Sequence, residues 1–154
     1  MAELDAGAKA PDFEMAGADG PVRLADFAGK TLVLYFYPKD DTSGCTKEAQ
    51  EFSALSAHFA AAGAAVLGVS KDSVASHGKF TAKYGLSVPL GSDPEGATLE
   101  AYGAWVEKSM YGRKYMGIER STFLIDGAGV IRRVWRKVKV PGHAAEVLKA
   151  VQGL

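Results

Sequence analysis

The stretch TLVLYFYPKDDTSGCTKE, residues 31–48, contains the features that decide the fold. Its first seven residues are apolar, aromatic or β-branched, a composition typical of a buried strand. Pro38 ends this strand because proline has no N–H to donate to a sheet ladder. The residues from Asp40 to Gly44 are polar or small, as turn residues usually are. The stretch therefore predicts a strand, a turn and a helix in succession, with Cys45 in the first turn of the helix.

Cys45 is the only cysteine among 154 residues, and its position predicts a reactive thiol. The first turn of a helix offers unpaired backbone N–H groups and the positive end of the helix dipole, and both stabilise a thiolate. A lone cysteine is more commonly a small buried hydrophobe. A core cysteine, however, is expected inside an apolar run, whereas Cys45 follows one across a polar turn. We therefore expect an ionised and exposed nucleophile here.

The same residues resemble an active-site motif. Pro38, Thr42 and Cys45 have the Pro-x-x-x-Thr-x-x-Cys spacing of the peroxiredoxins, and the wider string YFYPKDDTSGCTKEAQEF resembles their bacterioferritin-comigratory-protein, or PrxQ, branch. The resemblance implies a thioredoxin-like α/β fold, with a central mixed β-sheet flanked by helices, in one domain over residues 1–154. Three further segments agree in order and extend the resemblance over nearly the whole chain: Gly7 with Ala10-Pro11-Asp12-Phe13, Val69-Ser70-Lys71-Asp72 and Arg120-Ser121-Thr122-Phe123-Leu124-Ile125-Asp126.

The resemblance also implies an activity, the thiol-dependent reduction of hydrogen peroxide and organic hydroperoxides. Cys45 would attack the peroxide and become a sulfenic acid. Arg120 would stabilise the developing charge, Thr42 would hydrogen-bond the peroxide or the thiolate, and Pro38 would shield the sulfur. Glu48 would hold the Arg120 guanidinium through fork-like hydrogen bonds. Without the resemblance, Pro38 only ends a strand, Thr42 caps a helix, and Glu48 and Arg120 are ordinary surface charges.

Two positions depart from the branch. Ser43 stands where proline is usual, and serine can also begin a helix. Many members carry a second cysteine five residues after the first, a position that Gln50 occupies here. Other members place it in a later helix, but this chain has no other cysteine. A disulfide within one molecule is therefore excluded, and we expect an external thiol of the thioredoxin, glutaredoxin or glutathione type to reduce the sulfenic acid.

The amino-acid composition limits the binding partners and the cellular compartment that we expect. Apolar residues make up 47% and charged residues 23% of the chain, near globular averages, so a folded domain is expected. The formal net charge is zero, whereas nucleic-acid binding depends on a basic surface. No apolar run approaches the roughly 20 residues that a membrane span needs. Residues 1–5 lack the pattern of a signal peptide, and an unpaired cysteine suits a reducing compartment. We expect a cytoplasmic protein that binds neither nucleic acid nor membrane, and a monomer, as most of the branch are.

Hydrophobic periodicity and turn residues predict the remaining elements. Strands that alternate with helices, plus one hairpin, indicate an α/β fold with a mixed sheet. The basic run Arg132–Val138 is most simply the exposed face of an edge strand. The predicted order is a hairpin at 13–24, a strand at 31–37, the cysteine helix at 43–62, a strand at 65–69, a helix at 73–84 ended by Gly85, a turn at 92–96, strands at 121–125 and 130–138 joined by a hairpin turn, and a helix at 143–151.

Other chemistries fit the sequence less well. A Cys–His hydrolase needs a histidine beside the sulfur, but His58 lies about 20 Å along the same helix, and His77 and His143 occupy surface-like helix positions. Metal-ligand pairs at zinc spacing and a Cys-x-x-Cys motif are missing, so we expect neither a metal nor another cofactor. A non-enzymatic redox sensor or partner-binding protein of the same fold stays open, and the rate of reaction with peroxide separates it from a peroxidase.

The segment Tyr102–Met116 is rich in aromatic and sulfur side chains. Such residues usually pack, which favours a cap over the sheet. A pocket wall, or a docking surface for the reductant or another subunit, is the alternative that the sequence leaves open.

Overall fold

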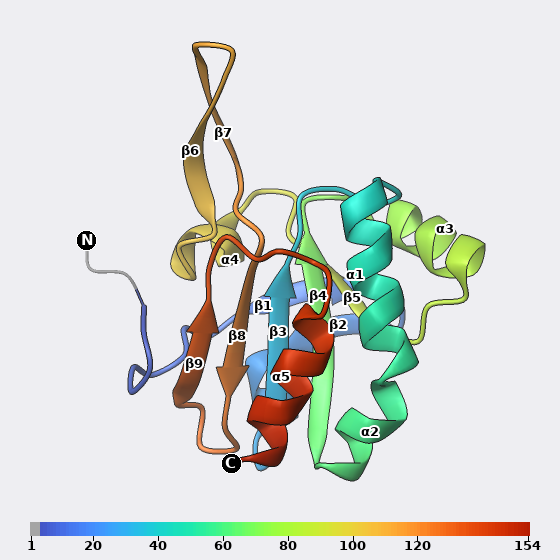
Figure 1. The fold of residues 1–154 in the computed structure, drawn as a ribbon, viewed down its shortest axis with the longest axis vertical. Helices are drawn as coiled ribbons and strands as arrows, with labels where there is room; N and C mark the ends of the chain where they lie inside the picture. Colours follow the sequence, from blue (N-terminus) through green and yellow to red (C-terminus); the bar gives the residue numbers. More distant parts are fainter. Residues whose placement is uncertain (1–3) are drawn as a thin grey trace.

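A computed structural model describes residues 4–154 and contains a seven-stranded mixed sheet with helices on both faces (Figure 1). The strand order is β2-β1-β5-β4-β3-β8-β9, and a separate two-stranded sheet pairs β6 with β7. This is the α/β architecture predicted from the sequence. The elements are β1 (Glu14–Gly17), β2 (Gly20–Arg23), β3 (Thr31–Phe36), α1 (Ser43–Ala54), α2 (Ser56–Ala61), β4 (Ala64–Ser70), α3 (Val74–Tyr84), β5 (Leu90–Ser92), α4 (Ala97–Ala101), β6 (Trp105–Met110), β7 (Arg113–Ile118), β8 (Ser121–Ile125), β9 (Ile131–Trp135) and α5 (His143–Gln152), with a 3-10 turn at Leu24–Phe27.

Strand β3 lies in the middle of the sheet and leads to the cysteine. It pairs in parallel with β4 and antiparallel with β8, and its residues from Leu32 to Phe36 are buried. Successive side chains of a strand point to opposite faces, so both faces of β3 must be covered by other elements. One face packs against α1, α2, α3 and α5, and the other against the N-terminal segment, α4 and the base of the β6–β7 hairpin.

The cysteine helix is shorter than predicted. It breaks at Leu55, whose φ of −100° and ψ of 4° leave the helical range, and α2 continues after this residue. The break lets α2 turn while its Phe59 packs against Phe52 of α1, with ring centroids 5.8 Å apart. Elsewhere, Ser73 caps the start of α3 and Gly85, at φ 61°, ends it as predicted. The sequence missed β5, α4 and the β6–β7 hairpin.

The prediction that Tyr102–Met116 caps the sheet is wrong for most of this segment. Tyr102 is fully buried, but the β6–β7 hairpin that follows projects away from the body of the protein (Figure 1). Tyr111 at its tip is 99% exposed, and its φ of 52° belongs to the tight turn that it forms with Gly112. The aromatic and sulfur-containing residues of this segment therefore lie largely on an exposed hairpin and do not cover the sheet.

One edge of the sheet agrees with a further expectation. Strand β9 is an edge strand, and its Arg132 and Arg133 are exposed, as the basic run predicted. Among residues 4–154, no helix has the length and apolar character needed to cross a membrane. The expectation about a signal peptide concerns residues 1–5, of which residues 1–3 lie outside the described residues.

Candidate active site

Cys45 lies in the first turn of α1, as predicted, but its side chain is not exposed. It is 2% accessible and belongs to the core cluster that covers one face of the sheet. The first backbone hydrogen bond of the helix runs from the Thr46 N–H to the Thr42 carbonyl, 2.8 Å, so Cys45 stands where the helix dipole favours an anion. The expectation of an exposed thiol was wrong, because Cys45 packs within this core cluster and Arg120 also contacts its sulfur.

Arg120 lies between β7 and β8 and joins the two acidic groups of the site. Its Nη2 donates to Cys45 Sγ at 3.3 Å, and its Nη1 donates to Glu48 Oε1 at 2.7 Å. Burial works against the charged guanidinium, but Glu48 and Cys45 outweigh it and hold the pKa of Arg120 above its usual value. The structure thus brings together three of the five residues that the sequence singled out, Cys45, Glu48 and Arg120.

Gly44 is a residue of the site whose role the sequence reasoning missed. A Cβ at this position would lie 3.2 Å from Arg120 Nη2, closer than most side-chain contacts. The glycine next to the cysteine therefore lets the guanidinium approach the helix start. Its position next to Cys45, inside the motif, was the one sequence feature that could have indicated this role.

Glu48 is 1% exposed and only partly satisfied by hydrogen bonds. Its Oε2 has no hydrogen-bond partner among the described residues, so the predicted fork with Arg120 is in fact one bond through Oε1. Burial raises the pKa of Glu48 to about 7, although Arg120 acts to lower it. The carboxylate is therefore held less firmly than a fully paired one, and it neutralises Arg120 only in part.

Thr42 and Pro38 lie on the surface next to this buried group. Both residues are exposed. The Thr42 hydroxyl donates to the Lys39 carbonyl at 2.8 Å and, within the described residues, makes no N-cap hydrogen bond. Because its proton is used, the Thr42 oxygen is left to accept a hydrogen bond. Of the two roles predicted for Thr42, this favours acceptance from a peroxide over helix capping.

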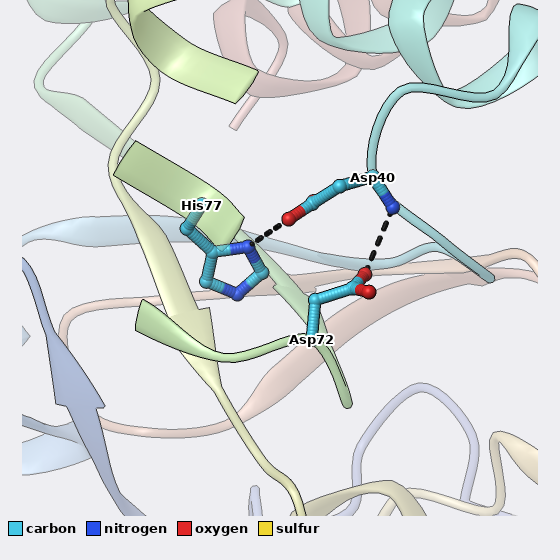
Figure 2. A group of neighbouring side chains, drawn as sticks. All are labelled: Asp40, Asp72 and His77. Atoms are coloured by element: carbon cyan, nitrogen blue, oxygen red, sulfur yellow. Dashed lines mark hydrogen bonds and ion pairs between the residues drawn. The ribbon is translucent and has the colours of Figure 1, made fainter. Parts of the chain in front are cut away.

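A second polar cluster lies on the other side of the turn and was not predicted (Figure 2). Asp40 is 7% and His77 4% exposed, and His77 Nδ1 lies 2.8 Å from Asp40 Oδ2. The Asp40 N–H donates to Asp72 Oδ2 at 2.8 Å. The expectation that His77 and His143 are surface residues was wrong, since His143 is 6% exposed as well. Both look polar in a helical pattern, but each meets a buried polar partner.

The cluster of Asp40, Asp72 and His77 is also the place where a metal would be sought. Their ligand atoms lie within 4.8 Å of one another. The Asp40 N–H points at the Asp72 carboxylate, however, and Ser70 Oγ donates to that same Oδ2 at 2.7 Å. Hydrogen bonds thus already use the oxygens that a cation would need, and we assign no metal to the cluster.

His143 packs against α1 and β8, and among the described residues no hydrogen bond joins it to Cys45. Its Nε2 lies 2.8 Å from the hydroxyl of Thr122, and its ring meets Phe52 edge-on. Burial lowers the pKa of His143 to about 4, against the influence of Glu146. A neutral ring packed in this way supports α5 against α1.

Comparison with known proteins gives consistent matches over most of the chain. Residues 6–134 match the model of the AhpC/TSA family. Peroxiredoxin Bcp of Bacillus subtilis is 48% identical over 152 residues, which cover 98% of this chain and 97% of the relative. Peroxiredoxin Bcp of Xanthomonas campestris is 54% identical over 129 residues, 84% of this chain and 81% of the relative.

Solved structures agree with these sequence matches. A form of Xanthomonas campestris peroxiredoxin Q superposes with a TM-score of 0.91 at 47% identity, covering 97% of this chain and 99% of that one. The Xanthomonas campestris bacterioferritin comigratory protein has been solved as a trapped intermediate/ligand complex that bears on its alkyl peroxide reduction activity. That structure matches with a TM-score of 0.88 at 48% identity, over 92% of this chain and 90% of that one. Two forms of the Xanthomonas protein have serine at one of two different cysteines, whereas this chain has one cysteine.

Proposed function

Because this chain belongs to the AhpC/TSA family, among its Bcp/PrxQ peroxiredoxins, we propose that Cys45 carries out the reduction of peroxides. The protein is a thiol-dependent peroxidase, and we propose that Cys45, Arg120 and Thr42 perform the reaction with the support of Pro38 and Glu48. The observation that carries the proposal is the contact of Arg120 Nη2 with the sulfur of the single cysteine, 3.3 Å, at a helix N-terminus.

The first half-reaction is an attack of sulfur on oxygen. The Cys45 thiolate forms an S–O bond with one peroxide oxygen, the O–O bond breaks, and the other oxygen leaves with the electron pair. Sulfur is oxidised and the peroxide is reduced. Protonation then gives Cys45 sulfenic acid and one molecule of water or alcohol.

Three groups bond to the reacting atoms in this step, and two more residues support them. Arg120 stabilises the thiolate and the charge that develops on the oxygens, as oriented donors do in other enzymes. The Cys45 backbone N–H, in the first turn of α1, adds a second donor. Thr42 accepts a hydrogen bond from the peroxide through an oxygen whose proton is already donated to Lys39. Pro38 shields the site from water, and Glu48 positions Arg120.

The second half-reaction requires a thiol from outside the chain. Cys45 is the only cysteine, so the sulfenic acid has no internal partner. An external thiol displaces water to give a mixed disulfide, and a second thiol releases Cys45 and forms the reductant disulfide. The reductant is of the thioredoxin, glutaredoxin or glutathione type. We also place the protein in the cytoplasm as a monomer, with residues 1–154 acting as one domain.

Hydrogen peroxide and organic hydroperoxides are the proposed substrates. The Xanthomonas campestris relative, which is described by its alkyl peroxide reduction, supports the organic ones. Comparing the stopped-flow oxidation rates of Cys45 with hydrogen peroxide and with an alkyl hydroperoxide tests this. Rates no faster than those of a free thiol would favour a redox sensor instead.

Recycling is tested separately by mass spectrometry. One equivalent of peroxide should add one oxygen to the protein, and a sulfenate-selective reagent should trap it. Excess peroxide should carry the same sulfur to the sulfinic acid. Dithiothreitol, glutathione and thioredoxin are then compared as electron donors. Rapid, quantitative formation of a Cys45–Cys45 dimer would instead mean that a second subunit resolves the intermediate.

A further inference from the structure

A cavity of about 310 Å³ lies at the connection between β9 and α5. Figure 1 shows this connection crossing from the edge strand to the helix. The cavity is lined by Trp135 at the end of β9, by basic residues of the connection, and by His143 and Glu146 in the first turn of α5. Its volume is at the lower end of the range for ligand pockets, so it suits a small molecule. We name it the β9–α5 cavity.

Two lysines give the β9–α5 cavity positive charge. Lys137 and Lys139 both line it and are exposed, and among the described residues neither has an ion pair or a side-chain hydrogen bond. Arg136 lines it too, but its guanidinium donates to the carbonyls of Gly103 and Leu4, both at 3.3 Å. The two ammonium groups are therefore the cations that the cavity offers to a ligand.

The acidic residue of the cavity has partners of its own. Glu146 Oε2 accepts hydrogen bonds from Trp135 Nε1 at 2.5 Å and from Arg133 Nη2 at 3.4 Å. Arg133 thus compensates the charge of Glu146, while the charges of the two lysines have no counterpart within residues 4–154. The excess charge favours an anionic ligand.

His143 adds a hydrogen-bond donor to the same cavity. Its Nε2 lies 2.8 Å from the hydroxyl of Thr122, which is fully buried and has no other partner among the described residues. A buried hydroxyl that kept its proton unpaired would be costly, so Thr122 donates to Nε2. The proton of the neutral ring is then on Nδ1, for which no described residue is a partner. A donor beside two ammonium groups matches a carboxylate.

The β9–α5 cavity lies close to the reacting sulfur. The Val138 N–H donates to the carbonyl of Arg120 at 3.0 Å, and the side chain of Arg120 reaches Cys45. The His143 ring lies 6.0 Å from the ring of Phe52, which follows Cys45 by seven residues in α1, about 10 Å along the helix. An extended tripeptide also spans about 10 Å. A thiol of that size, held here by a carboxylate, therefore has its sulfur near Cys45.

We propose that the β9–α5 cavity binds a carboxylate of the thiol that reduces the Cys45 sulfenic acid, and that the preferred reductant is a small anionic thiol of the glutathione type. This inference rests on the proposed function of Cys45. Binding raises the effective concentration of the thiol beside its target.

The reaction at Cys45 is the mixed-disulfide step. The sulfur of the bound thiol forms an S–S bond with Cys45 and is oxidised, while the S–O bond of the sulfenic acid breaks and the Cys45 sulfur is reduced. The oxygen leaves as hydroxide and takes the thiol proton to become water. A second molecule of the same thiol then releases Cys45 and forms the disulfide of the reductant.

A pair of thiols that differ in charge tests the proposal. Hydrogen peroxide, one equivalent, first converts Cys45 to the sulfenic acid. Stopped-flow single turnover then compares glutathione with glutathione diethyl ester, which has the same thiol but no carboxylate. After correction for the thiolate fraction of each, wild-type protein should react roughly tenfold faster with glutathione, and added salt should narrow this ratio. Equal rates with the two thiols would overturn the proposal.

Lysine variants connect the ratio to the cavity. Lys137→Met and Lys139→Met should each lower it several-fold, and the double variant roughly tenfold, the scale for losing one or two solvent-exposed charge contacts. Lys149→Met is the matched control, because it removes an exposed lysine at the other end of α5 and should leave the ratio unchanged. A wild-type ratio in the double variant, or an equal fall in the control, would contradict the assignment.

The backbone of Lys137 provides a variant that separates binding from stability. Its φ of 49° lies in the left-handed region that favours glycine. Lys137→Gly should therefore unfold at a temperature no lower than the wild type, measured by calorimetry, and should still lose the preference for glutathione. Retention of the preference would show that the lysine does not bind the thiol.

A fatty-acid hydroperoxide also carries a carboxylate, and the oxidation half-reaction distinguishes the two sources. Stopped-flow oxidation by linoleic acid hydroperoxide is compared with oxidation by its methyl ester, in the wild type and in Lys137→Met/Lys139→Met. A charge preference that falls only for the thiols supports the proposal. A larger fall for the hydroperoxides would assign the cavity to the oxidant and overturn it.

Binding is also measurable without any reaction at sulfur. S-methylglutathione has no thiol, and in Cys45→Ser it should shift the nitrogen-15 signal of His143 Nδ1, an effect that the double lysine variant should lack. An unshifted signal would overturn the proposed site. Failure of hydrogen peroxide to oxidise wild-type Cys45 would instead count against the proposed function, and the binding of S-methylglutathione is read independently of that result.

Discussion

Two buried carboxylates, Asp40 and Glu48, flank the turn after β3, and they differ in how many hydrogen bonds they receive. Asp40 receives hydrogen bonds from Tyr37, Ser76 and His77, and its pKa lies below the usual range. Glu48 receives one bond from Arg120, and burial raises its pKa to about 7. The same type of side chain is thus stabilised as an anion on one side of the turn and destabilised on the other.

The difference teaches what each pair is suited to do. A carboxylate with three donors holds its neighbours in place, because moving any of them breaks several charge-assisted bonds. A carboxylate with one donor leaves much of the guanidinium charge uncompensated. That charge is then available to the sulfur of Cys45, which Arg120 Nη2 also contacts. The incompletely satisfied pair is the one next to the reacting sulfur.

Replacing Cys45 should have the largest effect. Cys45→Ser puts a hydroxyl where the thiolate stood, and a hydroxyl does not reduce peroxides, so turnover with dithiothreitol should fall below detection. The contacts of Asp40 and Glu48 should persist, since neither depends on sulfur. Peroxide consumption measures the loss of turnover, and denaturant unfolding shows whether the variant is still folded. Residual turnover in a folded Cys45→Ser protein would remove Cys45 from the mechanism.

Removing the charge of Arg120 should have the second largest effect on the oxidation rate. Arg120→Met keeps the volume but removes the donors, and oxidation should slow roughly 10²-fold or more, the scale for losing a charge-stabilising donor. Arg133→Met is the matched control, because Arg133 pairs with Glu146 on the exposed face of β9. Stopped-flow oxidation compares the two. Wild-type oxidation in a folded Arg120→Met protein would show that the contact with sulfur is incidental.

Thr42 tests whether the turn itself contributes chemistry in addition to its hold on α3. Thr42→Val keeps the shape and removes the oxygen, so oxidation should slow roughly tenfold or more. Thr42→Ser keeps the hydroxyl and should cost much less. Single-turnover rates of the two variants give the answer, and equal rates would mean that the turn acts only by holding the main chain.

The sequence predicted the residues around the sulfur better than the contact of Asp40 with His77, for a physical reason. Cys45, Thr42 and Glu48 lie within one local segment, and the motif together with the family resemblance also located Arg120, 75 residues away from the cysteine. His77 occupies a position in α3 that the sequence pattern makes look exposed, but it is buried and contacts Asp40, which belongs to the turn after β3. Such long-range polar contacts leave no periodic signal in a single sequence.

The same reasoning explains the errors in the fold. The central strands and α3 were predicted because apolar runs and helix caps are local signals. The β6–β7 hairpin was missed because exposed aromatic and methionine residues resemble a packed segment in composition, and Tyr111 shows how far exposure can depart from that expectation. The exposure of Cys45 was misjudged because the residue that covers it, Arg120, comes from a distant strand end.

Glu48→Gln should have the smallest effect on rate and the clearest effect on pH dependence. The amide keeps an acceptor for Arg120, so oxidation should slow only a few-fold. Because the pKa of Glu48 is about 7 in the folded protein and near 4.5 in an unfolded chain, the folded state holds a proton that the unfolded state has released across this interval. Wild-type stability should therefore fall relative to Glu48→Gln as pH rises, by up to about 1.4 kcal/mol per pH unit, and the difference should level off above pH about 7.

Denaturant unfolding of both proteins between about pH 5 and pH 8 measures this difference. Asp40→Asn gives the opposing case, because the pKa of Asp40 is lowered in the folded protein. The stability that the ionised Asp40 contributes is complete above the ordinary pKa of an aspartate, and it is lost only as pH falls through the pKa of Asp40 in the folded protein. Across the measured range the Asp40 carboxyl itself should therefore add no slope to the difference between the wild-type and Asp40→Asn curves, whereas the Glu48 carboxyl should give the wild-type and Glu48→Gln curves different slopes. Parallel wild-type and Glu48→Gln curves would mean that Glu48 is as well satisfied as Asp40, and the contrast between the two carboxylates would fail.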